Sequence, residues 1–450
     1  MPSRASAALE YHRRTVVAGP RGWEDDVHLR YEGPRPPLVK EYGGAERVAL
    51  DESLVGRLLR DGAGVVRSQP GRDYGGGTMH WRAYSSAGGL FPVEAYVAAP
   101  DGLLSFDPIA GELLRFAEGD ARATVGAAVD ADADAFVVLT GIHARTGWKY
   151  LKRGYRHVWW DAGTMLANLL ALAAADGLRP RLYVGFVDDE LHRLLDVDGA
   201  GECALAVLGL GGGGAAEEAR PVVPLAAAAP APRRPFPLAE AAHAAGTLPD
   251  VEAVRAWRAE PEGDEPRFER DEVVDAIRRR RSVRRYAPDP LPRDELAELL
   301  RWAEAPIPAD VPRVVREALT VAAVDGLVAG TYDARLELLR EHDERATRAQ
   351  AYFVAMDQDH ARAAAVNVFQ LADLDAVVAR LGDRGYRWAQ LEAGIRAGRL
   401  QLGAVTRGWG AVASTFFDAE ASALFETHES PMLMVSLGPR VPSPHARDGS

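Results

Sequence analysis

The stretch GYRHVWWDAG at residues 154–163 decides how the chain is organised, because a related stretch, GYRWAQLEAG, occupies residues 385–394. In both, Gly-Tyr-Arg is followed at the same distance by an acidic residue, Ala and Gly. The two copies are 231 residues apart, since 385 − 154 = 231, and the same offset aligns Gly177 with Gly408. A fixed spacing between similar stretches indicates an internal repeat.

Other pairs of similar stretches follow in the same order along the chain. They are Phe186 with Phe417, DGL at 101–103 with DGL at 325–327, LVGRLLR at 54–60 with LAELLRW at 296–302, and LG at 208–209 with LG at 437–438. Several matches in one order indicate a duplicated domain. We expect the two halves to pack about an approximate two-fold axis, as an intramolecular pseudo-dimer.

Each half mixes short apolar strands with helices. In the first half the pattern predicts strands over 93–99, 135–142, 182–186 and 203–208, a hairpin over 103–116, and helices over 51–60, 158–176 and 188–195. This mixture predicts the α+β fold class, as two α+β domains in tandem. We place the domains at 1–210 and 238–450, joined by a Gly/Ala/Pro linker over 211–237, and expect residues 1–50 to form an irregular arm.

The composition excludes several classes of protein. A net charge of -12 over 450 residues argues against non-specific nucleic-acid binding. The single cysteine, Cys203, excludes an intrachain disulfide and a cysteine metal cluster. The longest apolar run, 165–175, is too short to span a bilayer, and no signal peptide is visible, so we expect a cytosolic protein without a membrane anchor. The histidines lack the spacing of metal ligands, and neither a Walker loop nor a G-x-S-x-G motif occurs.

A run of arginines, RRRSVRRY at residues 279–286, lies past the middle of the chain. Guanidinium groups pair with phosphate oxygens in a planar, bidentate way, and the Ser282 hydroxyl can add a donor. The run therefore suits a phosphate monoester. Arginines at the C-terminal end of a solvated helix are the alternative reading, and residue type alone favours it.

Three motifs together resemble one enzyme family. RRSVRRY followed by a leucine-rich helix resembles the phosphate motif of the flavin-dependent nitroreductase superfamily, and SSAGGLFPVEAYV at 85–97 resembles a Pro-Ser-Ala-Gly-x-Leu-Tyr-Pro motif of its SagB/McbC-type azoline dehydrogenases. That branch has a Lys-Tyr pair before Gly-Tyr-Arg, and TGWKYLKRGYR places Lys149 and Tyr150 there. The resemblance implies two fused nitroreductase-like copies that bind FMN.

The two halves have lost different parts of the family's site. The first half has the Ser-Ala-Gly turn and the Lys-Tyr pair but KEYGGAERVAL in place of the arginine motif. The second half has the arginine motif but APIPADVPRVV in place of the turn, and no Lys-Tyr pair. Because the family binds FMN at a dimer interface, the resemblance implies that one composite site survives and its mirror image is lost.

The resemblance assigns residues of both halves to this composite site. Arg280, Ser282 and Arg284 would hold the phosphate, and Ser85, Ser86 and Gly88 would meet the flavin ring or its ribityl chain. Backbone N–H groups of Thr415 and Phe416 would face the N5 edge of the flavin, although the family prefers Gly where Phe416 stands. Arg440 would add phosphate charge or is an exposed surface residue.

The resemblance also implies a reaction. A base removes the Cα proton of a peptide thiazoline or oxazoline, and the Cβ hydrogen passes as hydride to FMN, which gives the aromatic azole. Lys149 and Tyr150 suit the role of base only if their pKa values fall well below about 10, and Lys152, Arg153 and Arg156 would push in that direction. Without the resemblance, the pair reads as surface residues in front of a helix.

We therefore expect an FMN-dependent azoline dehydrogenase that acts on a modified precursor peptide beside a cyclodehydratase partner. Two alternatives remain open from the sequence. One is an NAD(P)H-dependent flavin reductase of small molecules, and the other is a flavin-free scaffold subunit that presents a peptide to partner enzymes.

Overall fold

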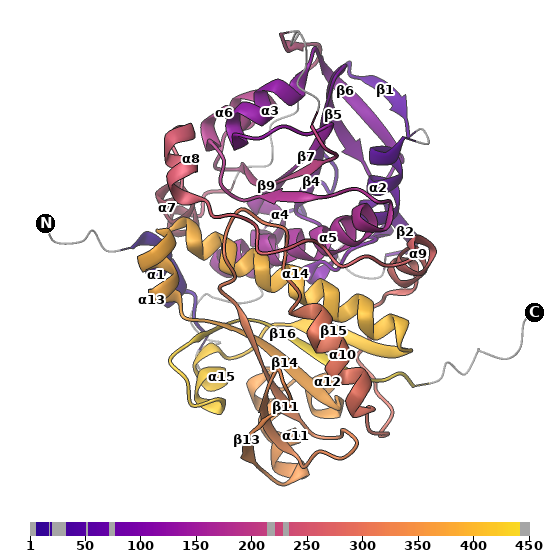
Figure 1. The fold of residues 1–450 in the computed structure, drawn as a ribbon, viewed down its shortest axis with the longest axis vertical. Coiled ribbons are helices and arrows are strands. Elements are labelled where there is room, and N and C mark those ends of the chain that lie inside the picture. The colour runs from indigo at the N-terminus through magenta and orange to yellow at the C-terminus, as the bar shows by residue number, and fades with distance from the viewer. Residues whose placement is uncertain are drawn as a thin grey trace, which may run out of the picture.

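The computed structural model describes residues 6–17, 19, 33–50, 53–71, 77–213, 221–227 and 234–441. Two large antiparallel sheets lie at opposite ends of the molecule, with long helices between them (Figure 1). The first sheet contains β1 (Glu46–Ala49), β4 (Val93–Ala99), β5 (Gly102–Asp107), β6 (Glu112–Glu118), β7 (Ala135–Ile142), β8 (Arg181–Tyr183), β9 (Glu202–Leu210) and β10 (Val223–Pro224). The second contains β11 (Arg316–Val321), β12 (Gly330–Asp333), β13 (Leu338–Glu341), β14 (Val366–Ala372), β15 (Trp409–Ser414) and β16 (Ser430–Pro439).

The order of strands is the same in both sheets. The first sheet runs β6-β5-β4-β7-β9-β8, and the second runs β13-β12-β11-β14-β16-β15. Strand β1 and the short β10 are additions that pair with β6. The shared order, with the helices around it, confirms two copies of one α+β fold in tandem. A third, small sheet is a hairpin of β2 (Val65–Pro70) and β3 (Thr78–Arg82).

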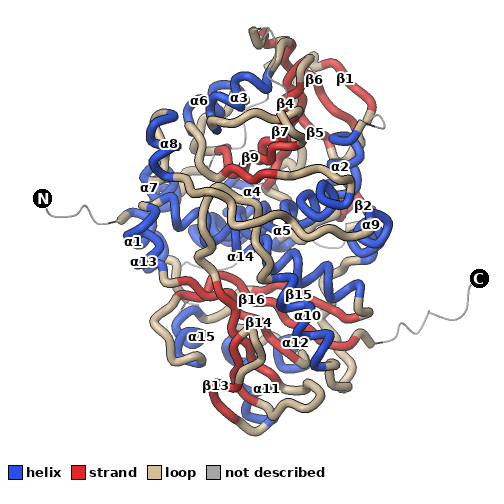
Figure 2. Tube along the Cα trace, in the orientation of Figure 1, coloured by secondary structure: helices blue, strands red, loops and turns tan. Residues whose placement is uncertain are grey.

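Helices surround and separate the sheets (Figure 2). In the first half they are α1 (Ala7–Arg14), α2 (Leu54–Ala63), α3 (Ala121–Val129), α4 (His143–Tyr150), α5 (Gly154–Ala175) and α6 (Asp188–Leu195), with 3₁₀ turns η2 (Ala87–Gly89) and η3 (Leu151–Arg153). The others are α7 (Pro237–Ala245), α8 (Val251–Trp257), α9 (Arg270–Arg279), α10 (Arg293–Ala303), α11 (Glu344–Val354), α12 (Asp359–Ala363), α13 (Leu374–Leu381), α14 (Arg384–Thr406) and α15 (Asp418–Leu424).

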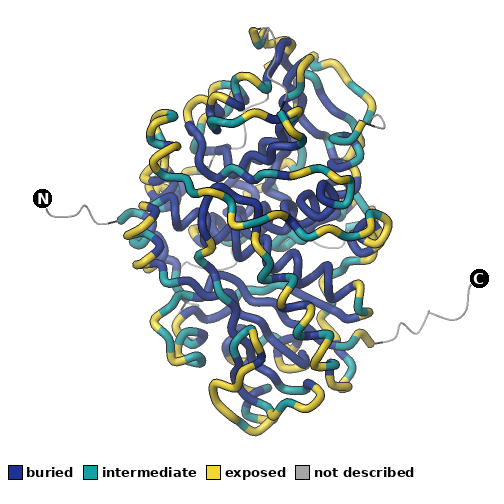
Figure 3. The backbone as a smooth tube through the Cα atoms, viewed as in Figure 1, coloured by how far each residue is buried: buried dark blue, intermediate teal, exposed yellow. Residues whose placement is uncertain are grey.

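The two long helices α5 and α14 pack against each other at the centre of the molecule, and both are buried (Figure 3). The glycines of the repeated motif make the closest approach. A Cβ added to Gly163 would lie 2.6 Å from the Cα of Gly394, and one added to Gly394 would lie 2.7 Å from the backbone oxygen of Trp160. Only glycine leaves room for this crossing. The segment His143–Ala175 is long and apolar enough to cross a membrane, but 94% of its apolar 18-residue window is buried inside the protein.

Buried ion pairs join the halves on one side of this crossing. Arg153 and Arg156, around the start of α5, both bind Asp418 at the start of α15, with N–O distances of 2.8 and 2.7 Å. All three side chains are at most 3% exposed. The buried charges of these two arginines of the first half thus have their counter-ion in the second half.

The mirror image of this arrangement lies on the other side. Arg384 and Arg387, at the start of α14, bind Asp188 at the start of α6 with distances of 2.6 and 2.8 Å. Each half therefore contributes two buried arginines that form ion pairs with one carboxylate of the other half. This exchange supports the predicted pseudo-dimer.

The N-terminal arm takes part in the duplication, which the sequence prediction missed. Arg156 donates to the His12 carbonyl in α1, and Arg387 donates to the His243 carbonyl in α7, again 231 residues apart. The expectation of an irregular arm over 1–50 is wrong for residues 7–14, which form α1, and for 46–49, which form β1. Residues 1–5, 18 and 20–32 of the arm lie outside the described residues, as do 214–220 and 228–233 of the predicted linker.

The cationic stretch before the predicted helix over 158–176 is itself helical. Residues 143–153 form α4 and η3, and α5 begins at Gly154 rather than at 158. The physical reason is that Arg153 and Arg156 are buried against Asp418. Their charge marks an interface between the halves and not a solvent-facing surface.

Candidate active site

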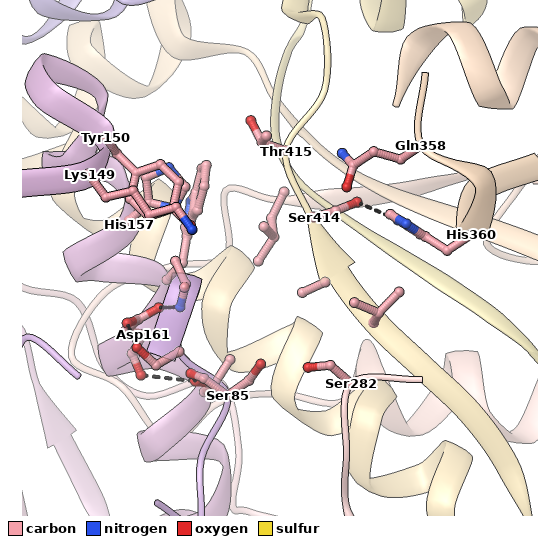
Figure 4. Close-up of a pocket in the computed structure, with 18 of the residues that line it drawn as sticks. Ser85, Lys149, Tyr150, His157, Asp161, Ser282, Gln358, His360, Ser414 and Thr415 are labelled. Carbon is pink, nitrogen blue, oxygen red and sulfur yellow. Dashed lines mark hydrogen bonds between the residues drawn. The ribbon is translucent and has the colours of Figure 1, made fainter. Parts of the chain in front are cut away.

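A cavity of about 440 Å³ lies between the two halves, beside the α5–α14 crossing (Figure 4). One wall comes from the first half: the turn around η2, the end of α4 and one face of α5. The opposite wall comes from the second half: the arginine run, the start of α12 and the end of β15. The residues around it are Ser85–Gly88, Lys149, Tyr150, His157, Trp160, Asp161, Thr164, Ser282, Arg284, Met356, Gln358, His360, Val412–Thr415 and Leu433.

A second cavity of about 830 Å³ adjoins the first and extends to the β2–β3 hairpin. It shares Ser85, Ser86, Gly88, Lys149, Ser282 and Arg284 with the first cavity. Arg280 lines this second cavity only. The predicted turn, Lys-Tyr pair and arginine motif are therefore brought together, although about 200 residues separate them in sequence (280 − 85 = 195).

The Ser-Ala-Gly turn is held in place by α5. The Asp161 carboxylate accepts the Ser86 hydroxyl at 2.5 Å and the Ala87 N–H at 3.0 Å, and Ser86 Oγ in turn accepts the Phe91 N–H at 2.8 Å. Thr164 donates to the Ser85 carbonyl at 2.6 Å. The Ser86 side chain is thus committed to shaping the turn.

Asp161 is a buried carboxyl group whose surroundings disfavour its charged form. Burial raises its pKa to about 7, against the lowering effect of its hydrogen bonds from Ser86 and Ala87. Because the unfolded chain releases this proton near the ordinary Asp value of about 3.9, folding retains a proton between about pH 4 and 7. Stability therefore falls as the pH rises through that range.

We expect Asp161→Asn to remove this pH dependence. The wild-type protein should lose stability relative to the variant between pH 5 and 8, because only the wild type must ionise a buried carboxyl group. Urea unfolding of both proteins at pH 5 and 8 measures the difference, and Asp189→Asn, at an exposed position of helix α6, serves as the control. Parallel pH profiles for the wild type and Asp161→Asn would contradict the assignment.

Lys149 and Tyr150 lie directly against the turn. A Cβ added to Gly88 would be 3.0 Å from the Tyr150 hydroxyl and 3.2 Å from Lys149 Nζ, and Gly88 has a φ of 62°. Glycine is therefore required here both for its backbone conformation and for space. The Tyr150 ring stacks on His157 with centroids 4.1 Å apart.

The three cations that were expected to support this pair have different surroundings. Arg153 and Arg156 share one counter-ion, the Asp418 carboxylate, which offsets part of their charge. Lys152 is exposed to solvent, which weakens any effect of its charge. The effect of these three cations on the pKa values of Lys149 and Tyr150 stays a prediction.

The arginine run supplies cations to the opposite wall. Ser282 and Arg284 line both cavities, and Val283 donates its N–H to the Ala411 carbonyl of β15 at 3.0 Å. Burial and the charges of Arg281 and Arg67 lower the pKa of Arg280 to about 10, so it remains a cation at neutral pH.

Two predicted residues lie outside the cavities. Arg440 is exposed at the end of β16, although its charge reaches Arg281. The Phe416 side chain is buried in an apolar cluster with Phe369.

The end of β15 offers donors with no acceptor. Within the described part of the chain, no group accepts the backbone N–H of Thr415 or Phe416. The Thr415 hydroxyl is buried and also lacks a partner among the described residues. Buried donors without an acceptor are costly, so this wall suits a ligand that brings acceptor atoms. Donors here, Gly88 opposite and cations at one end form a set that fits FMN.

The corresponding backbone N–H groups of the first half have an acceptor within the protein. Val184 and Gly185 lie 231 residues before Thr415 and Phe416. Their N–H groups donate to the two oxygens of the Asp310 carboxylate, at 2.7 and 3.0 Å. Asp310 thus occupies the place that a ligand would take in the mirror site.

Other groups close the mirror site further. Segment 308–310 pairs with β8 through Leu182, and the Trp257 ring lies against Gly185. Glu392 accepts the N–H groups of Val314 and Val315, much as Asp161 accepts the Ala87 N–H and the Ser86 hydroxyl of the intact turn. The stretch APIPADVPRVV therefore fills the mirror-related site. We call this stretch the plug.

Sequence reasoning missed several residues around the first cavity. Residues 157, 160, 161 and 164 form one stripe of α5, with the i, i+3, i+4, i+7 spacing that could have identified His157 and Thr164. Met356, Gln358 and His360 come from the α11–α12 region, which carried no motif. His360 bonds Ser414 Oγ through Nε2 at 3.1 Å, and burial together with the charge of Arg284 lowers its pKa to about 4, so it is neutral at pH 7.

Comparisons with known proteins agree with this arrangement. The profile of the Nitroreductase family matches residues 47–212 and 277–438. A protein of Methanocaldococcus jannaschii that bears a nitroreductase name is 27% identical over 189 residues, 39% of this chain and 95% of that protein.

Solved structures extend the comparison to the whole chain. A crystal structure from Anabaena variabilis, also named as a nitroreductase, has a TM-score of 0.81 at 25% identity and covers 97% of this chain and 100% of its own. The E. coli microcin synthetase McbBCD complex with truncated pro-MccB17 matches 46% of this chain and 93% of its own, at 18% identity and a TM-score of 0.31.

Proposed function

The chain belongs to the nitroreductase family, whose members are flavin-dependent oxidoreductases, and we propose that it oxidises azolines in a modified peptide to azoles with FMN at one composite site. The observation that carries this proposal is the meeting of Lys149, Tyr150 and the Ser-Ala-Gly turn with the arginine motif in one pair of adjoining cavities. The Lys-Tyr pair and the turn are the features that resemble azoline dehydrogenases.

The residues divide between cofactor and substrate. Arg280, Ser282 and Arg284 would bind the phosphate, and Thr415 with its neighbouring N–H groups would bind the ring. Bound FMN supplies the hydride acceptor for the oxidation. Gly88 leaves the space in which ligand and Lys149 meet.

The protein's own part in the chemistry is proton transfer and positioning. Removal of the Cα proton requires a base within hydrogen-bond reach of the substrate. Tyr150 and Lys149 lie side by side at the cavity wall, with Nζ 5.4 Å from the ring centroid. We assign Tyr150, in its phenolate form, as the base that takes the proton and becomes a phenol, and Lys149 as the cation that stabilises this phenolate before the transfer. His157 fixes the plane of the Tyr150 ring.

The direct test of the proposed activity is oxidation of a defined substrate. Purified protein is incubated in air with a synthetic peptide that contains one thiazoline, and mass spectrometry follows the loss of two hydrogens. Reduction of the flavin by NAD(P)H without azole formation would support the flavin reductase instead. A colourless protein that cannot be loaded with FMN would support the scaffold.

We expect one FMN per chain, because Asp310 occupies the mirror-related amides. Arg284→Ala removes a phosphate contact, and Gly88→Trp fills the space beside Tyr150, so each variant should weaken FMN binding by about tenfold or more. Titration of flavin into apoprotein measures both the ratio and the affinity. Arg285→Ala, at a neighbouring exposed position that lines neither cavity, should bind FMN like the wild type.

Two results would contradict the composite site. One is a ratio of two FMN per chain. The other is that the Arg284→Ala protein and the Gly88→Trp protein each still bind FMN at one site with wild-type affinity. That result would place the two residues in separate sites.

A further inference from the structure

The larger cavity carries more positive charge than a flavin phosphate needs. Six cationic side chains line it and, among the described residues around it, no carboxylate does: Arg67, Arg82, Lys149, Arg280, Arg281 and Arg284. A phosphate monoester brings a charge of only about −1.5 to −2 at neutral pH. This concentration of cations also stands out in a chain whose net charge is -12.

Some of these cations already have tasks. Arg82 is buried and donates to the carbonyls of Leu38 and Val93, so it supports the fold. Arg280, Arg284 and Lys149 belong to the proposed flavin site. The surplus consists of Arg67 and Arg281, one from each half. Arg281 Nη1 donates to the carbonyls of Arg278 and Arg280, whereas its Nε and Nη2 have no acceptor among the described residues.

The surplus pair is arranged as a binding surface. Arg67 lies on the β2 strand with its guanidinium over the Trp81 ring, 5.4 Å from the centroid. Burial lowers the pKa of Arg281, and the nearby charges of Arg67 and Arg440 lower it further. Cations held together in this way are stabilised by a bound anion.

The hairpin beside these cations suits an extended chain. In the part of the chain that the structure describes, β2 and β3 pair only with each other, so their outer edges can accept a further strand. Val66, Met79 and Trp81 add apolar surface to the cavity. At its inner end the cavity reaches Gly88 and Lys149, which it shares with the smaller cavity.

On the basis of the function proposed above, we propose that the larger cavity binds an acidic segment of the peptide substrate. Carboxylates of this segment pair with Arg67 and Arg281, and the flanking azoline residue lies at Lys149. The channel thereby selects peptides by the charge next to the residue that is oxidised. Its positive charge would also draw an acidic peptide towards a protein whose overall charge repels it.

Binding of labelled peptides tests this without requiring turnover. Three peptides of equal length, with Asp, Asn or Lys at the positions that flank a thiazoline, are titrated by fluorescence anisotropy against FMN-loaded protein. We expect the Asp peptide to bind about tenfold more tightly than the Asn peptide at low salt, with the difference shrinking as salt is added. Arg67→Gln should remove most of that difference, whereas Arg47→Gln, on strand β1 and paired with Glu112, should preserve it.

The flavin content of each variant separates this site from the cofactor site. Arg67→Gln should retain FMN with wild-type affinity and, if the peptide is oxidised, should raise KM while leaving kcat unchanged. Loss of FMN from Arg67→Gln would assign Arg67 to the flavin phosphate and overturn the inference.

The remaining outcomes are equally decisive. Equal binding of the three peptides would overturn the inference. Reduction of the flavin by NADPH that is abolished by Arg67→Gln would also overturn it, because the cavity would then bind a nucleotide. Tight, Arg67-dependent binding of the Asp peptide without any azole formation would instead refute the proposed reaction and leave the acidic-peptide site standing.

Discussion

Asp188→Asn should lower the free energy of unfolding by about 3–5 kcal/mol, because it leaves two buried arginines without a counter-charge. The Asp188 carboxylate binds Arg384 at 2.6 Å and Arg387 at 2.8 Å, and it also accepts the Leu248 N–H at 3.0 Å. The asparagine side chain keeps the shape but loses the charge and one acceptor oxygen. Urea unfolding at pH 7 measures the change.

The acid dependence of the same pair gives a second signature. Burial opposes ionisation of Asp188, but the charges of Arg384 and Arg387 outweigh it and lower its pKa to about 2. The ion pair therefore contributes fully above the unfolded value of about 3.9 and is lost as the pH falls towards 2. The difference between the wild type and Asp188→Asn should shrink over that range.

A matched control isolates the buried pair. Asp189→Asn makes the same change of charge at the next position, where the side chain is exposed, and should cost less than about 0.5 kcal/mol. Asp418→Asn removes the mirror-related carboxylate and should be as destabilising as Asp188→Asn. If Asp188→Asn were no more harmful than Asp189→Asn, the exchanged arginines would not hold the halves together.

The fold could largely be predicted because its signals were local or repeated. Strands over 93–99 and 135–142 and the helix over 188–195 have the predicted bounds, since each is a short apolar or amphipathic run with clear limits. The duplication followed from residues that the α5–α14 crossing requires, above all Gly163 and Gly394. Polarity misled the prediction where charges are buried in pairs.

The candidate site was predictable only where a motif existed. The turn, the Lys-Tyr pair and the arginine run each resemble a known pattern, and their complementary losses indicated that the two halves share one site. His360 and Gln358 could not be found in this way, because their place at the cavity depends on how α11 and α12 pack on the second sheet. Nor could the plug be recognised, because it depends on a single aspartate, Asp310, which accepts the N–H groups of Val184 and Gly185 in the other half.

Tyr150→Phe should lower kcat for azole formation by about 10²- to 10⁴-fold, the usual contribution of a positioned general base. The phenylalanine ring preserves the stacking on His157, whose centroid lies 4.1 Å from that of Tyr150. Only the hydroxyl beside Gly88 is removed. Single-turnover oxidation of a thiazoline peptide under saturating substrate measures the loss, and flavin absorbance shows that the cofactor is still bound.

Lys149→Met separates the role of the cation from that of the base. If Lys149 stabilises the Tyr150 phenolate, its loss should raise the pH at which the rate reaches half its maximum, so that part of the activity returns at high pH. Tyr150→Phe should show no such recovery, because no phenol remains to ionise. Lys152→Met, at an exposed position three residues beyond Lys149, should leave the profile unchanged. Full activity of both Lys149→Met and Tyr150→Phe with flavin bound would remove the pair from the mechanism and direct attention to His157 and His360 as the other titratable rings at the cavity.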